Sequence, residues 1–173
     1  MKGMEDSVNI KLFRLQLIGN KGDTTYINLE ELKKLPRTEV VFDFKCIEGW
    51  SQVTRWAGVK FSDFAKYYHA GTRDGSVIPD KPGDSWYKYA GFQTPNGKYY
   101  VGIDMPSVMH NQTILCYEMN GKPLPLPDGA PLRLIIPVKY GVKHLKRIGR
   151  IYFSDDPPPD YWAKYGYDYF AGL

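Results

Sequence analysis

The stretch VVFDFKCIEGWSQVTRW, residues 40–56, carries the most informative pattern in the chain. Its first half is rich in β-branched and aromatic residues, which is typical of a strand. Directly after Cys46 comes EGWS, a polar turn with a glycine through which a strand would not continue. We therefore expect the Cys46 thiol at the end of a rigid strand, facing a loop, with a second strand starting near Arg55.

The length of 173 residues suits one domain, residues 1–173, with a core of its own. Thirteen prolines and seventeen glycines predict many turns and short elements, so we expect a β-rich fold. A net charge of +4 without a dense basic run argues against nucleic acid as a partner. No apolar run reaches the length of a membrane span, and the N-terminus MKGMEDSVNI shows no export signal. We expect a cytoplasmic protein, or a periplasmic or extracytoplasmic one if the sequence is trimmed.

Periodicity and turn residues predict the other elements. We expect strands at residues 10–18, 26–27, 77–78, 86–92, 99–103, 113–119, 132–137 and 151–153. Helices are expected at residues 29–35, capped by Asn28, and 63–69, capped by Ser62, with a helical turn at 106–112. The aromatic tail after residue 159 is expected to pack on the surface of the domain.

The two cysteines are too few and too far apart for a disulfide framework, and no compact zinc motif is present. Cys116 lies within the apolar run ILCYEM and is expected in the core. Cys46 is either a buried small hydrophobe or a reactive thiolate that acts as a nucleophile or metal ligand. Its place between a strand and a glycine turn favours the thiolate.

Residues 142–150 form a basic loop that follows Gly141 directly, between two apolar strands. Such a charge run is usually a solvated face, yet backbone N–H groups at a glycine turn beside Lys and His also suit a phosphate. Arg133 alternates with Leu132 and Leu134 and so faces away from them. It lies either at a solvated edge or in the same anion site.

Several segments together resemble the molybdopterin-binding domain of the sulfite oxidase family, especially its prokaryotic members. They are FKCIEGWS, TRWAGVKFSDF, YEMNGKPLPLPDGAPLRLIIPVKYGVKHLKRIGRI and the tail YW…YGY. They occur in the family's order and spacing, and the resemblance covers about residues 10 to 167. The segment that begins at Tyr117 is long and highly specific.

This resemblance implies an α+β fold with a β-rich core and short helices. It also implies a molybdenum atom held by one molybdopterin (Mo-MPT), with Cys46 as the protein ligand to the metal and no haem. A soft thiolate suits this metal. The other residues that the resemblance assigns are Tyr99, an active-site tyrosine, and Arg133, His144, Leu145 and Lys146, which bind the cofactor.

The activity implied is oxygen-atom transfer with a small-molecule oxo donor or acceptor. Electrons would come from or go to a separate partner, because the sequence shows no second redox site. Glu48, close to Cys46, would repel a sulfite dianion, so we expect reduction of a neutral S-oxide or N-oxide. The alternatives are sulfite oxidation, a carrier or subunit that binds molybdopterin without turnover, and a thiol enzyme that uses Cys46 and a histidine.

Overall fold

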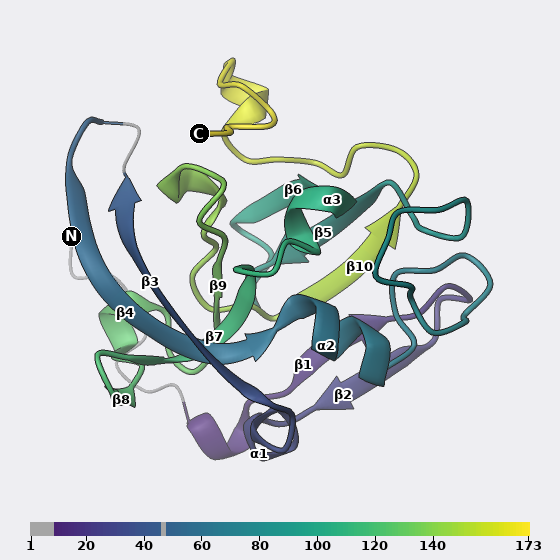
Figure 1. The fold of residues 1–173 in the computed structure, drawn as a ribbon, viewed down its shortest axis with the longest axis horizontal. Helices are drawn as coiled ribbons and strands as arrows, with labels where there is room; N and C mark the ends of the chain where they lie inside the picture. The colour runs from purple at the N-terminus through teal and green to yellow at the C-terminus, as the bar shows by residue number, and fades with distance from the viewer. Residues whose placement is uncertain (1–8, 46–47) are drawn as a thin grey trace.

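The computed structural model describes residues 9–45 and 48–173, whose strands form two five-stranded sheets around a shared main core (Figure 1). Sheet A has the order β2 (Thr24–Ile27), β1 (Leu15–Ile18), β10 (Arg150–Ser154), β5 (Tyr89–Gln93) and β6 (Tyr100–Asp104). Sheet B has the order β3 (Arg37–Lys45), β4 (Ser51–Lys60), β7 (Ile114–Met119) and β8 (Lys122–Pro123), with β9 (Arg133–Ile135) also paired to β7.

The helical elements are short and connect the strands. They are α1 (Leu29–Lys33), α2 (Phe61–Tyr67), α3 (Met105–Val108) and the 3-10 turns η1 (Ile10–Leu12), η2 (Leu126–Asp128), η3 (Gly141–Lys143) and η4 (Ala163–Tyr165). None of the helices in the described ranges has the length and apolar character needed to cross a bilayer. The predicted α+β class with a β-rich core is confirmed.

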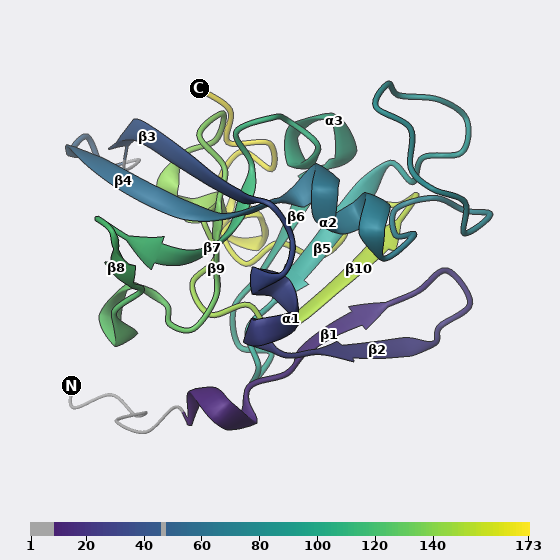
Figure 2. The ribbon, with the colours of Figure 1, turned by 60° about the horizontal axis from the view of Figure 1, so that its bottom comes forward.

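The hairpin of β3 and β4 is paired from Arg37 opposite Val59 to Lys45 opposite Ser51. Both ribbon views show it reaching beyond the rest of sheet B (Figure 1, Figure 2). Where β4 also pairs with β7, the register shifts at Gly58. A Cβ atom on Gly58 would lie 2.0 Å from the Leu115 carbonyl oxygen, so this close approach of two backbones requires glycine.

The two faces of sheet B carry different side chains, because successive residues of a strand point to opposite sides. Along β7, Leu115 and Tyr117 join the main core, whereas Cys116 joins a second, smaller cluster on the other face. The second cluster consists of Val40, Trp56, Ile114, Cys116, Leu124, Ala130 and Ile135, with Phe42, Phe44 and Met119 packed against it. Because Arg133 is paired directly with Cys116, its side chain lies on this second face.

The predicted start of α1, with Asn28 as its cap, is confirmed. Asn28 accepts the Glu31 backbone N–H at 2.8 Å, while the Glu31 carboxylate accepts the Asn28 N–H at 2.7 Å. The predicted cap at Ser62 is wrong: α2 begins at Phe61, two residues before the expected start at residue 63, and its N-cap is Lys60. The Phe61 N–H instead donates to the carbonyl of Thr113 at 2.9 Å, so a tertiary contact replaces the side-chain cap.

Two predicted strand segments are also wrong. Residues 10–12 form the turn η1, because the Asn9 side chain accepts the Lys11 N–H at 3.1 Å and starts a helical turn. Residues 77–78 form no strand; Ile78 is buried as a single apolar side chain. The preceding loop is held by its own turn contacts, in which Asp74 accepts the Ser76 N–H and hydroxyl.

Candidate functional site

A cavity of about 660 Å³ opens on the face of sheet B that carries the second cluster. Its wall combines segments that are far apart in the sequence: the β3–β4 hairpin, residues 94–99, residues 128–146 around β9, and the C-terminal residues Trp162 and Tyr167. A neighbouring groove of about 820 Å³ shares Tyr99 and Lys146 with this cavity.

Arg133 is a buried cation in the cavity wall, with 3% of its surface exposed. Its Nη1 donates to the Asp128 carbonyl at 3.0 Å and its Nη2 to the His144 carbonyl at 3.2 Å. The guanidinium carbon lies 4.8 Å from the Trp56 ring centroid and 5.7 Å from that of Phe44. Burial lowers the pKa of Arg133 to about 10, so it remains charged at neutral pH.

The Nε–H group of Arg133 is buried and has no hydrogen-bond partner within residues 9–45 and 48–173. An unsatisfied donor on a buried cation is unfavourable, and an anion in the cavity would satisfy both its charge and its hydrogen bond. Of the two places considered for Arg133, the structure therefore selects the cavity and excludes the solvated edge.

His144 borders the same cavity but offers no charge to it. Its Nδ1 accepts the Ile136 N–H at 3.3 Å, which leaves the proton on Nε2 for donation to the Lys139 carbonyl at 3.0 Å. Burial, with the nearby charge of Arg133, lowers the pKa of His144 to about 3. The ring packs against Phe44, with centroids 4.7 Å apart. His144 thus presents a neutral ring to a ligand, and its ring nitrogens are both occupied.

The other residues of the predicted basic loop lie in different parts of the structure. Lys146 lines the cavity and donates to the Pro127 carbonyl at 2.9 Å. Leu145 is fully buried in the main core and contributes packing rather than a cavity contact. Lys143 is buried against the C-terminal segment. Arg150 on β10 donates hydrogen bonds to the side-chain oxygen of Gln16. Within the described loop, Lys146 supplies the cationic group of the cavity.

Tyr99 lines the cavity, and its hydroxyl donates to the Val142 carbonyl at 2.6 Å. Burial, reinforced by the charge of Asp160, raises the pKa of Tyr99 to about 12. The phenol is therefore neutral at any physiological pH and acts as a hydrogen-bonding group rather than a base.

The opening of the cavity is aromatic and carries carboxylates. Trp50, which is 52% exposed, stacks on Phe44 with ring centroids 6.2 Å apart. Glu48 and Asp128 line the same cavity as Arg133 and Lys146, so two carboxylates face two cations. Sequence reasoning identified Glu48 from its distance to Cys46, but no local signal marks the two C-terminal aromatic residues as part of this wall.

Cys46 and Ile47 lie outside the described residues. The residues on either side of them that line the cavity are Phe44 and Glu48. Cys116, predicted to be a core residue, is fully buried, and burial raises the pKa of its thiol to about 12. The described residues contain no cluster of three or more His, Cys, Asp and Glu suited to a metal ion.

Comparisons with known proteins identify the family of this chain. Residues 2–162 match the family model of the oxidoreductase molybdopterin-binding domain. A subunit named YedZ1 in Azospira oryzae, assigned to protein-methionine-sulfoxide reductase, is 34% identical over 165 residues, which cover 95% of this chain and 58% of that protein. The protein-methionine-sulfoxide reductase catalytic subunit MsrP of Campylobacter jejuni is 30% identical, with 98% of this chain and 59% of the relative covered.

Among solved structures, the sulfane dehydrogenase SoxCD of Paracoccus pantotrophus matches with a TM-score of 0.70 at 19% identity, which shows a shared fold. The match covers 87% of this chain and 40% of that one. The chain belongs to the oxidoreductase molybdopterin-binding domains, within the sulfite oxidase family. It spans about three-fifths of the length of the two curated relatives named above.

A domain of this family implies a molybdenum cofactor, and the cavity fits an anionic, planar ligand. Two buried donors that face no partner in the described structure, Arg133 Nε and Trp56 Nε1, belong to residues of its wall. Lys146 adds a second positive charge, and the neighbouring aromatic rings provide flat apolar surfaces.

The neutral, buried state of His144 predicts a pH dependence of stability. In the unfolded chain His144 binds a proton near pH 6.5, whereas in the folded protein it does so only near pH 3. The unfolded state therefore binds more protons between these values, so stability decreases as the pH is lowered through this range. From pH 7 to pH 5 this group should remove about 2 kcal/mol from the free energy of unfolding.

Urea unfolding of the cofactor-free protein at both pH values tests this expectation. His144→Gln should show a smaller difference between pH 7 and pH 5 than the wild type. His110→Gln, a change at a partly exposed histidine, is the matched control and should keep the wild-type difference. An unchanged difference in His144→Gln would contradict the assigned state of the ring.

Proposed function

We propose that this chain catalyses oxygen-atom transfer at a molybdenum–molybdopterin cofactor, in the direction that reduces a neutral S-oxide. The observation that carries the proposal is the buried guanidinium of Arg133 in the wall of an aromatic cavity, whose Nε–H has no hydrogen-bond partner among the described residues. Membership of the family and the names of the relatives support the reaction class.

In this proposal Arg133 and Lys146 bind the anionic group of the cofactor, and the Cys46 thiolate binds the metal. Charge-assisted hydrogen bonds from a buried guanidinium are among the stronger polar contacts in proteins. The neutral ring of His144 packs beside this group, and Leu145 holds the loop in the core. When bound, the cofactor supplies the two-electron exchange of an oxygen atom.

The remaining charges of the cavity favour a neutral substrate. The charges of Arg133 and Lys146 are neutralised by the bound anion, which leaves the carboxylates of Glu48 and Asp128 uncompensated. An approaching sulfite would meet this negative field, whereas a neutral S-oxide would not. Trp50 and the other aromatic side chains at the opening suit the apolar substituents of such a molecule.

Electrons would be exchanged with a separate partner. One relative is named as a catalytic subunit and another as a subunit of a reductase, which supports a divided enzyme. The part of this chain that the structure describes has no metal-binding cluster of its own. The neutral Tyr99 hydroxyl, which donates to the Val142 carbonyl, lies in the cavity wall as a hydrogen-bonding group.

The metal ligand is tested by two cysteine variants. Protein produced in a host that makes molybdopterin should contain about one molybdenum (or tungsten) atom per chain by elemental analysis. Cys46→Ala should lose most of it, because the thiolate is the protein ligand. Cys116→Ala is the matched control and should retain it, because Cys116 is buried in the second cluster. Equal metal content in all three proteins would contradict the role of Cys46.

The substrate class is tested at Glu48. The wild type should reduce dimethyl sulfoxide with a viologen donor well above its rate of sulfite oxidation. Glu48→Gln should raise kcat/KM for sulfite by about three- to tenfold at low ionic strength and leave sulfoxide reduction nearly unchanged, because only the anion senses the carboxylate. High salt should reduce the difference.

Glu39→Gln is the control, since Glu39 pairs with Arg37 and Arg55 on the hairpin and lies outside the cavity. Rapid sulfite oxidation by the wild type, insensitive to Glu48→Gln, would overturn the substrate proposal. Metal-loaded protein that turns over neither substrate would instead support the carrier alternative.

A further inference from the structure

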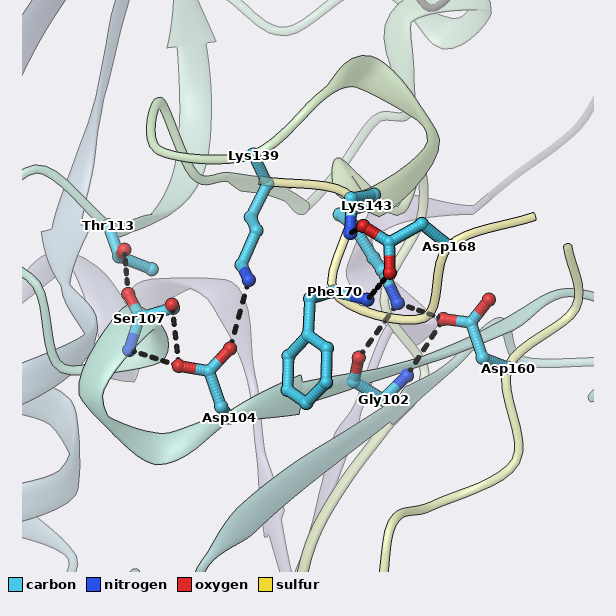
Figure 3. Close-up of polar contacts among 10 residues, drawn as sticks. Gly102, Asp104, Ser107, Thr113, Lys139, Lys143, Asp160, Asp168 and Phe170 are labelled. Carbon is cyan, nitrogen blue, oxygen red and sulfur yellow. Dashed lines mark hydrogen bonds and ion pairs between the residues drawn. The ribbon is translucent and has the colours of Figure 1, made fainter. Parts of the chain in front are cut away.

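Two buried lysines on the loop after β9 hold the C-terminal segment, residues 155–173, against the rest of the protein (Figure 3). The Lys143 ammonium lies 2.5 Å from Asp160 Oδ2 and donates to the Gly102 carbonyl at 3.0 Å. The Lys139 ammonium lies 2.9 Å from Asp104 Oδ1 and 5.5 Å from the centroid of the Phe170 ring. Neither lysine lines the cavity. The Lys143 ammonium pairs with a carboxylate of the segment, whereas the Lys139 ammonium pairs with Asp104 at the start of α3.

Asp160 fixes the backbone on both sides of the attachment. Its Oδ2 also accepts the Gly102 N–H at 3.2 Å, and its Oδ1 accepts the Ala163 N–H at 3.1 Å. The next residue, Tyr161, donates its N–H to the Tyr100 carbonyl at 3.0 Å. One carboxylate thus ties the start of η4 to strand β6 and to Lys143.

The segment lies so close to β6 that only glycine is accommodated there. A Cβ atom on Gly102 would lie 2.0 Å from the Tyr169 hydroxyl oxygen and 2.9 Å from the Pro158 carbonyl. The Tyr169 ring in turn lies 4.6 Å from the Lys143 ammonium. These contacts place the segment at a defined position on the sheet rather than loosely on its surface.

Between its attachment points the segment forms part of the cavity wall. Trp162 and Tyr167 both line the cavity, with ring centroids 5.2 Å apart. Tyr161 packs against Tyr99 with centroids 5.1 Å apart, so the attached segment also contacts the cavity tyrosine. The charge of Asp160 contributes to the raised pKa of Tyr99.

A buried ion pair is a costly way to hold a segment if stability is the only requirement, because well-packed apolar residues are often equally stable. An ion pair differs in that it defines a direction and a distance between two groups. The Lys143–Asp160 pair is the attachment that immediately precedes Trp162, whereas Lys139 acts near the end of the chain.

We propose that the Lys143–Asp160 pair positions Trp162 and Tyr167 as the wall that selects among neutral S-oxides by the size of their apolar substituents. The proposal rests on the proposed function and adds the residues that set its specificity. Asp160 and Lys143 are positioning residues that act through the two aromatic side chains.

The first test compares two sulfoxides of different size. The ratio of kcat/KM for methyl phenyl sulfoxide to that for dimethyl sulfoxide should change at least about fivefold in Asp160→Asn, mainly through KM. Trp162→Ala leaves the ion pair intact and should shift the ratio in the same direction, so the test stands even if Asp160→Asn folds poorly. Asp104→Asn breaks the other buried pair and is the matched control; its ratio should stay within about twofold of wild type.

The second test needs no cofactor and no turnover. In hydrogen–deuterium exchange of the cofactor-free protein, Asp160→Asn should speed exchange at least about tenfold in residues 161–167 and little in residues 105–110. Asp104→Asn should show the opposite pattern, because the Ser107 N–H donates to Asp104.

The outcomes separate this inference from the proposed function. If the wild type is active and the substrate ratio is unchanged in both Asp160→Asn and Trp162→Ala, the size selection by Trp162 and Tyr167 would be wrong, while the proposed function would stand. Unchanged exchange in residues 161–167 of Asp160→Asn would overturn the positioning by the ion pair. A wild type that binds its metal but reduces neither sulfoxide would overturn the proposed function, and the selection of substrates with it.

Discussion

The cavity depends on one buried cation, the guanidinium of Arg133, held between backbone carbonyls and the aromatic rings of the β3–β4 hairpin. A charge in such a place is unfavourable unless it has partners, and the protein supplies them for two of its three nitrogens. The third nitrogen has no partner among the described residues, which is the basis of the anion site that we propose. Trp56, in the same wall, also has a buried indole N–H without a hydrogen-bond partner among the described residues.

The loop of residues 138–146 connects this cation to the rest of the protein. Its carbonyl groups accept hydrogen bonds from Arg133, His144 and Tyr99, and its buried lysines hold the C-terminal segment. One side of the loop therefore contacts Arg133 in the cavity wall, and the other side contacts the C-terminal segment through Lys143. A substitution on either side of the loop should therefore alter the other side through a few backbone contacts, rather than by loosening the packing of the core.

Local patterns in the sequence predicted much of this arrangement. The β-branched and aromatic run before Cys46 predicted β3, and the apolar run ILCYEM predicted β7. Alternation predicted that Arg133 faces away from its neighbours, because side-chain direction in a strand follows from position. The second strand was expected to start near Arg55, but β4 already begins at Ser51. Burial could not be predicted in the same way. Arg133 is covered by rings of residues that are distant in sequence. Lys143 pairs with Asp160 in a C-terminal segment that carries no local signal, and Lys139 pairs with Asp104 at the start of α3. Likewise, His144 was expected to bind an anion, yet backbone groups of residues 136 and 139 occupy both of its ring nitrogens.

The central claim is that Arg133 marks the anion site of the cofactor. A crystal structure of the metal-loaded protein tests it most directly. We predict an anionic oxygen of the cofactor within about 3 Å of Arg133 Nε, at charge-assisted hydrogen-bond distance, with Lys146 on the same group. A cofactor bound in the neighbouring groove instead, with Arg133 Nε still unpartnered, would contradict the account.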